Sequence, residues 1–238
     1  MNISLDKKTW ETQVKLLYLT DITDLWLAKF RPKKMLRLLV HAGSWKTDSG
    51  HLALGLHFGV GYVALLDLNN NNLKPYFVLD VSPVDFKYQS LMENFYRKAR
   101  IKHVNSISGG MAIAKGGGYQ RVKNCAKNKS IPIILYDAPQ LDRETKYKLR
   151  VFNKDYSIAS GFINLICKEK IAYQLYNVTL DYKTGLRKIT INPLKTTENK
   201  TELISELSNY FEKVLKNDPQ QWYFWRQSQN IFKNSSKS

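Results

Sequence analysis

The stretch Leu52-Ala53-Leu54-Gly55-Leu56-His57-Phe58-Gly59-Val60-Gly61-Tyr62 carries the clearest fold signal in this chain. It begins with an apolar run at 52–56, which leads into a histidine and two nearby glycines. A second apolar run, Tyr62-Val63-Ala64-Leu65-Leu66, follows directly. This order predicts a buried strand, a tight turn that carries His57, and a helix that leads away from the turn.

The rest of the chain alternates between strand-like and helix-like segments. Further strands are predicted at 75–81, 102–107, 131–137, 149–153, 172–179 and 186–191. Helices are predicted at 9–30 with a break near 21–24, 88–100, 109–127 with a kink at 116–118, 157–168 and 203–215. Residues 43–51 and 138–147 read as loops. Strands that alternate with helices predict an α/β fold with a mostly parallel open sheet, covered by helices on both faces.

Length and composition indicate one folded domain. A chain of 238 residues, 43% of them hydrophobic, can bury a substantial core. We expect a single domain over residues 1–238, with a helical N-terminal extension at 1–45 and a frayed tail at 229–238. The two cysteines, Cys125 and Cys167, lack metal-type spacing, which favours a reduced, intracellular protein. We find neither a signal peptide nor a membrane span, so we expect a soluble or peripheral protein.

The helix at 9–30 has apolar residues at helical spacing, among them Trp10, Leu17, Leu25, Trp26 and Phe30. One interpretation is that this stripe packs on the core. The alternative is docking on a lipid surface, because the end of the helix is followed by a basic run: Lys29, Arg31, Lys33, Lys34 and Arg37.

Two of the predicted strands end in ionisable residues, His57 and Asp137. Functional groups gather at the carboxyl ends of strands in an open α/β sheet. If these two strands are neighbours, Asp137 can orient the imidazole, and His57 becomes a general base for a hydroxyl or amine. The alternatives are a buried histidine with both nitrogens satisfied, and an aspartate that caps its own loop.

Several short motifs occur in a familiar order: His57-Phe58-Gly59, Asp137, Val151-Phe152 with Ser157 to Gly161, and Asn217-Asp218-Pro219 with Trp222 and Trp225. Over roughly residues 50–228 the chain resembles the bacterial lipid A biosynthesis acyltransferase family of lysophospholipid-acyltransferase-like proteins. The resemblance implies a single acyltransferase-like domain of that fold. It also implies transfer of a fatty acyl group from an acyl carrier protein or coenzyme A thioester to a hydroxyl or amine, with His57 as the base.

The resemblance has one clear departure at the site. The family signature places an acid five residues after the histidine, and here that position is Tyr62. The nearest downstream acid, Asp67, is ten residues after His57, about three helical turns away. Either Asp137 supplies the missing charge, or the protein binds acyl chains or lipids on the same fold without catalysing a reaction.

The excess of basic residues indicates which kinds of partner the protein attracts. Lys and Arg outnumber Asp and Glu by 37 to 20. The segment from Asp85 to Ser130 contains ten basic residues and two acidic ones. Such an excess attracts anions such as an acidic carrier protein, a phosphopantetheine donor or an anionic membrane surface, although a solvated surface is the alternative. We expect Arg100 and Arg121 to contact the anionic group, and Gly59, Gly61 and Tyr62 to complete the substrate site.

Other classes of partner have less support. Nucleic-acid binding rests on the formal charge of +17 alone, without a recognisable motif. The four histidines show no ligand spacing, so we expect no metal and no cofactor beyond the acyl-thioester co-substrate. We expect a cytoplasmic location, in solution or peripheral on the inner face of the cytoplasmic membrane. The oligomeric state, the acyl chain and the acceptor stay open.

Overall fold

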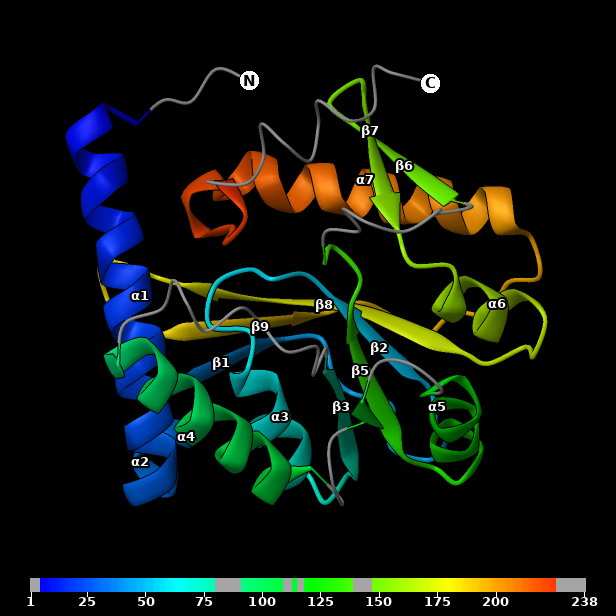
Figure 1. Ribbon diagram of the computed structural model, residues 1–238, viewed down its shortest axis with the longest axis horizontal. Helices are drawn as coiled ribbons and strands as arrows, with labels where there is room; N and C mark the ends of the chain where they lie inside the picture. Colours follow the sequence, from blue (N-terminus) through cyan, green and yellow to red (C-terminus); the bar gives the residue numbers. More distant parts are fainter. Residues whose placement is uncertain (1–4, 80–90, 109–112, 115–117, 139–146, 226–238) are drawn as a thin grey trace.

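The computed structural model describes residues 5–79, 91–108, 113–114, 118–138 and 147–225, which form an α/β protein (Figure 1). The helices are α1 (Lys7–Phe30), α2 (Pro32–Leu36), α3 (Val63–Asn70), α4 (Leu91–Ile107), α5 (Gly118–Lys127), α6 (Gly161–Cys167), α7 (Lys200–Asn217) and the 3-10 helix η2 (Pro219–Gln221). The strands are β1 (Leu39–Ala42), β2 (Leu52–Gly55), β3 (Pro75–Leu79), β4 (Ile113–Ala114), β5 (Ile131–Leu135), β6 (Tyr147–Val151), β7 (Lys154–Ile158), β8 (Tyr173–Leu180) and β9 (Arg187–Ile191).

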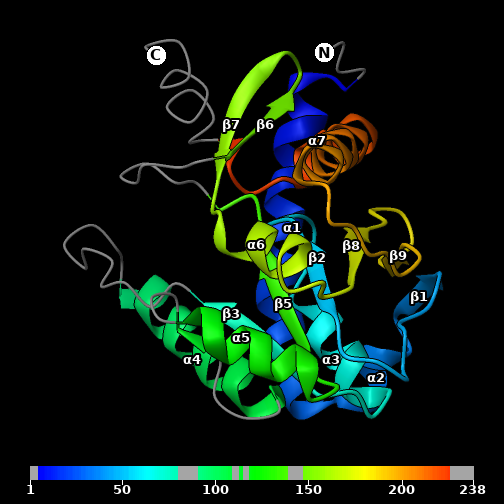
Figure 2. The same cartoon turned by 90° about the vertical axis from the view of Figure 1, so that its right-hand side faces the viewer.

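Seven strands form the main sheet, in the order β1-β9-β8-β2-β5-β3-β4. Neighbouring strands run parallel throughout this order except at β8 and β9, which pair antiparallel. The predicted α/β class with a mostly parallel sheet is therefore confirmed. Strands β6 and β7 form a separate antiparallel ribbon beside α7 (Figures 1 and 2).

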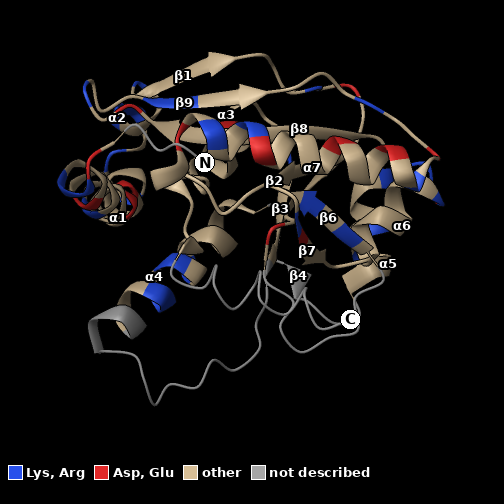
Figure 3. Cartoon of the chain, turned by 90° about the horizontal axis from the view of Figure 1, so that it is seen from above, with Lys and Arg blue, Asp and Glu red and all other residues tan. Residues whose placement is uncertain are grey.

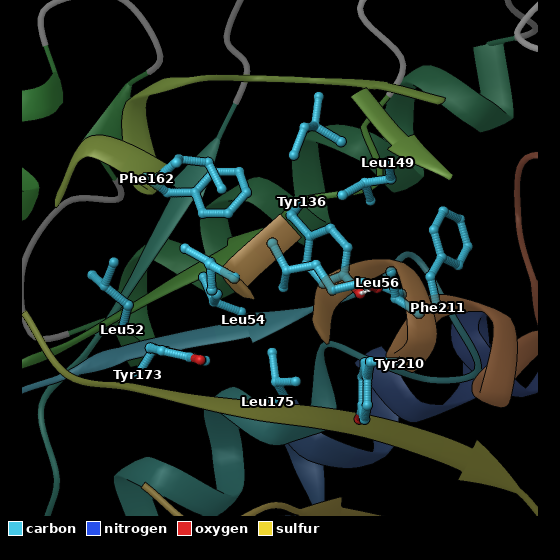
Figure 4. Close-up of a cluster of buried hydrophobic side chains, with 14 of the residues drawn as sticks. Leu52, Leu54, Leu56, Tyr136, Leu149, Phe162, Tyr173, Leu175, Tyr210 and Phe211 are labelled. Carbon is cyan, nitrogen blue, oxygen red and sulfur yellow. Dashed lines mark hydrogen bonds between the residues drawn. The ribbon is translucent and has the colours of Figure 1, made fainter. Parts of the chain in front are cut away.

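The sheet has a hydrophobic core on each face, as the alternation of side chains along β2 requires. Leu52 and Leu54 point into a cluster that includes residues of α5, α6 and α7 (Figure 4). Ala53, between them, belongs to a second cluster with residues of α1, α3 and α4. A strand buried on both faces is continuously apolar, which is why the run at 52–56 is the strongest strand signal in the sequence.

Helix α1 is continuous, so the predicted break near 21–24 is wrong. The side chains of Asp21 and Asp24 turn inward and are 4% and 0% exposed. Each forms an ion pair with an arginine distant in sequence, Arg100 for Asp21 and Arg187 for Asp24. Because both carboxylates are paired inside the protein, the helix does not have to break in order to expose them to water. The segment at 1–45 also contains β1, which pairs with β9, so it is not a purely helical extension.

Several predicted boundaries also differ. The predicted strand at 102–107 is the end of α4, where Val104 and Ile107 are buried. The predicted helix at 157–168 begins only at Gly161, because residues 154–158 form β7. The predicted helix at 109–127 is α5 from Gly118 onward, preceded by the short β4. Residues 80–90, most of the loop at 138–147 and the tail at 229–238 lie outside the described residues.

Candidate active site

The site forms where β2 and β5 end side by side. The two strands are parallel, and Gly55 pairs with Leu135 in register. His57 and Asp137 therefore each lie two residues beyond the last pair, at the carboxyl edge of the sheet. The condition that these two strands are neighbours is therefore met.

Asp137 holds His57 through both its backbone and its ring. The carboxylate is fully buried and accepts hydrogen bonds from the His57 backbone N–H (2.8 and 3.0 Å) and from Nδ1 (2.8 Å). The indole Nε1–H of Trp222 donates a further hydrogen bond of 2.8 Å to the same carboxylate. These donors offset the cost of burying the charge. The partners are 80 and 85 residues away in sequence, whereas a loop-capping aspartate bonds its own turn.

The contact with Asp137 determines which imidazole nitrogen is free. A carboxylate only accepts hydrogen bonds, so the neutral imidazole carries its proton on Nδ1 and leaves the Nε2 lone pair free. The His57 side chain is 33% exposed, and the hydrogen bonds found among the described residues involve Nδ1 rather than Nε2. The ring is thus held in the tautomer that a general base needs.

The C-terminal segment after α7 supports the histidine turn from outside. The Tyr223 N–H donates to the His57 carbonyl (3.0 Å), and the Gly59 N–H donates to the Gln221 carbonyl (2.9 Å). The side-chain amide of Gln221 bonds the Leu180 backbone N–H (2.8 Å) and C=O (2.9 Å), which ties the segment to the end of β8. The Phe224 ring lies 4.6 Å from the His57 ring, centroid to centroid.

The two glycines of the turn have different roles. Gly59 adopts a φ of +56°, and a Cβ there would lie 1.9 Å from the Val178 carbonyl oxygen. Only glycine fits such a position. At Gly61 the closest atom to an added Cβ is the Phe58 carbonyl oxygen at 3.4 Å, an ordinary contact. The turn therefore requires glycine at 59 but not at 61.

A cavity of about 340 Å³ opens beside the His57 ring. Its walls are mainly apolar: Leu56, Phe58, Leu65, Phe77, Ile101, Val104, Leu135 and Phe224. Gly59, Gly61, Tyr62 and Arg100, which we predicted as site residues, also line it. A volume in this range and a mostly apolar lining with a few polar groups are typical of small-molecule sites.

Of the two arginines predicted to contact an anionic group, Arg100 and Arg121, only Arg100 lines the cavity. Arg100 lines the cavity, but its guanidinium is paired with Asp21 and donates to the Tyr96 hydroxyl (3.0 Å). Arg121 lies exposed on α5 and is not among the lining residues. Arg97, which we did not single out, lines the cavity one helical turn from Arg100, and no ion pair within the described ranges engages it. Arg97 is therefore the better candidate for contact with an anion.

Tyr62 and Asp67 take no direct part in the His57 contact. The Tyr62 hydroxyl donates to the Asp24 carbonyl (3.4 Å), and its ring lies 5.5 Å from the Arg100 guanidinium. Burial raises the pKa of this hydroxyl well above its ordinary value, although Arg100 opposes the shift, so it stays protonated. The Asp67 carboxylate accepts from Trp45 Nε1 (2.8 Å) and contacts His41 Nε2 (2.9 Å).

Trp222 and Gln221 are the site residues whose roles the sequence did not reveal. Trp222 belongs to the motif that carries the resemblance, but no local pattern indicates that its N–H reaches a carboxylate 85 residues earlier. The four consecutive aromatic residues at 222–225 were the available sequence signal that this segment packs against the rest of the fold.

Fold and site together define an α/β protein with a histidine–aspartate pair beside an apolar cavity. No protein-family model matches the chain, and no curated protein matches it significantly. Among the residues described, no group of three or more His, Cys, Asp and Glu side chains is arranged to hold a metal ion. Within the same residues, every helix is too short or too polar to cross a membrane.

Proposed function

We propose that this protein is an acyltransferase of the lysophospholipid-acyltransferase-like type, in which His57 is the general base. The observation that carries the proposal is the buried hydrogen bond between His57 Nδ1 and Asp137 (2.8 Å) at the wall of an apolar cavity. The order of short motifs along residues 50–228 supports the same function and the finer fold assignment.

In the proposed reaction the acyl donor is a thioester of an acyl carrier protein or coenzyme A. His57 Nε2 takes the proton of the acceptor hydroxyl or amine as its oxygen or nitrogen attacks the thioester carbonyl. The carbon–sulfur bond then breaks, and the imidazolium returns the proton to the departing thiolate. Asp137 stabilises the imidazolium while it exists and keeps the ring in its orientation.

The cavity suits both parts of such a donor. The apolar walls can take up an acyl chain, whose burial is favourable in proportion to its apolar area. Arg97 lies in the same wall and can form charge-assisted hydrogen bonds with a phosphate of the phosphopantetheine arm.

The test is incubation of the full chain with acyl-thioesters and candidate acceptors, followed by mass spectrometry of the products. We expect acylated product with the wild type and none with His57→Ala. The His57→Ala variant should keep a melting temperature close to wild type, because the side chain is partly exposed and the backbone N–H of residue 57 and the Trp222 Nε1–H still donate to Asp137. Full activity of this variant would contradict the proposed role of His57.

A second candidate function is acyl-chain or lipid binding without turnover. Tyr62 supports it, because this buried, protonated tyrosine stands where the family signature has an acid. Binding without turnover would be favoured if a fatty acyl group copurifies with the protein and no acylated product forms. Any product that depends on His57 would exclude it.

A further inference from the structure

Helix α1 carries apolar side chains on two opposite faces, of which one is buried in the core. Leu17, Leu25 and Ala28 form the inward face and are at most 4% exposed. The outward face has apolar side chains at intervals of three and four residues, the spacing that places them in one row. They are Leu16 (42% exposed), Leu19 (58%), Ile22 (38%), Trp26 and Phe30 (65%). We call this row, with Phe95 of α4, the apolar stripe.

The stripe concentrates the exposed apolar surface of the molecule. Of the eight large hydrophobic side chains that are exposed in the described part of the chain, five belong to the stripe: Leu16, Leu19, Ile22, Phe30 and Phe95 (60% exposed). A contiguous exposed apolar patch marks an interaction surface, whereas single exposed side chains are ordinary.

The aromatic end of the stripe is ordered around one tryptophan. The Trp26 ring stacks on Phe30 and on Phe95, with centroid separations of 6.0 and 6.3 Å. The Lys29 ammonium lies 5.5 Å from the Trp26 ring and 5.2 Å from the Phe30 ring. Tryptophan and phenylalanine beside lysine are the residues that helices at a membrane–water interface use.

The charge at the C-terminal end of the stripe is of one sign. From Leu25 to Trp45 the sequence contains no acidic residue and five basic ones: Lys29, Arg31, Lys33, Lys34 and Arg37. Further back, the carboxylates of Asp21 and Asp24 turn inward and are paired with arginines, so they do not offset this charge at the surface. Figure 3 shows α1 at one side of the molecule, with α4 beside it; Lys and Arg lie on both helices, and α1 also carries Asp and Glu.

We infer that the apolar stripe and the adjoining basic residues of α2 dock on an anionic lipid bilayer, with α1 lying along the interface. The stripe enters the boundary between headgroups and acyl chains, and the basic residues contact anionic headgroups. A second copy of this chain fits less well, because each copy carries a formal charge of +17 and two copies therefore repel each other. Helix α4 carries both Phe95 of the apolar stripe and, on another side of the helix, the residues Arg97, Arg100, Ile101 and Val104 of the cavity wall.

The test uses the full chain and vesicles of phosphatidylcholine and phosphatidylglycerol in equal parts, with pure phosphatidylcholine vesicles for comparison. We expect co-sedimentation with the anionic vesicles and a blue shift of tryptophan emission that Trp26→Phe removes. Leu19→Glu and Phe30→Glu should each weaken the partition at least about tenfold, since each places a charge in the apolar boundary. Val40→Glu is the matched control, because Val40 is similarly exposed (42%) but lies on β1.

Three outcomes would overturn the inference. They are no binding to anionic vesicles, equal weakening by Val40→Glu and Leu19→Glu, and a concentration-dependent dimer that Leu19→Glu dissociates without any vesicle binding. The inference does not depend on the chemistry at His57: His57→Ala should bind vesicles like the wild type. Loss of acyl transfer and loss of docking can therefore be observed separately.

Discussion

Replacing Asp137 with asparagine tests the central contact of the site with almost no change of shape. The two carboxylate oxygens accept hydrogen bonds from the His57 backbone N–H, from His57 Nδ1 and from Trp222 Nε1. An amide has one accepting oxygen and a donating nitrogen. In either orientation of the amide, at least one of these N–H groups faces another donor.

Both effects have an expected size. A buried donor without a partner costs about 1–3 kcal/mol in the free energy of unfolding. For a chain of 238 residues, this corresponds to a fall in melting temperature of about 2–12 °C. The catalytic effect is larger. The imidazole can satisfy the amide by accepting at Nδ1, which moves its proton to Nε2 and removes the base. We expect kcat to fall by about 10²–10⁴, with KM changed by less than about threefold.

Thermal unfolding followed by circular dichroism measures the first effect, and thiol release from the acyl-thioester measures the second. The control is the double variant His57→Ala with Asp137→Asn. Residues that act as one unit have non-additive effects, so the second substitution should change little once His57 is absent. The reasoning is refuted if Asp137→Asn keeps more than about a tenth of the wild-type kcat, or if the two substitutions act additively.

Three further predictions concern the turn, the pH dependence and the basic side chains. Gly59→Ala should cost about 2–4 kcal/mol, because φ is positive and the added methyl meets a backbone oxygen, whereas Gly61→Ala should cost less than about 1 kcal/mol; equal urea midpoints for the two would contradict this. Burial holds the pKa of His51 below its ordinary value of 6.5. The unfolded chain therefore binds a proton there first, and stability should fall as the pH drops below 6.5. Urea unfolding at about pH 7.5 and about pH 5.5 measures this loss, which His51→Gln should reduce; an unchanged slope would show that other groups cause it. Arg97→Gln should raise KM for the acyl-thioester about 5–50-fold, and Arg121→Gln should leave it unchanged; the reverse result in steady-state kinetics would restore Arg121 to the site.

The histidine–aspartate contact could be predicted on the condition that the two strands are neighbours, because it depends on strand order alone. Both residues end continuous apolar runs, and the carboxyl ends of neighbouring parallel strands meet at one edge. Nothing more than the adjacency of β2 and β5 was needed to bring them together. The choice between Arg97, Arg100 and Arg121 could not be made in this way. It depends on which side of each helix faces the cavity, and therefore on packing.

The wrong predictions have two physical causes: distant contacts that override local preference, and a turn whose residues give a weak local signal. Asp21 and Asp24 suggest a helix break in isolation, but arginines 79 and 163 residues away stabilise the helix through them. The ribbon of β6 and β7 was missed because its two-residue turn is Phe152-Asn153. Both residues have positive φ, +48° and +60°, and phenylalanine gives no turn signal there.

The support that Gln221, Trp222 and Tyr223 give to the histidine turn has a consequence for synthesis of the chain on the ribosome. A growing chain emerges from its N-terminus, so the strands that carry His57 and Asp137 are available to pair well before this segment exists. Until it has been made, the buried Asp137 lacks the Trp222 N–H, and the turn lacks its backbone partners. A nascent or prematurely terminated chain would thus hold the His57 imidazole loosely. Under the proposed function, the order of translation itself delays the appearance of the general base.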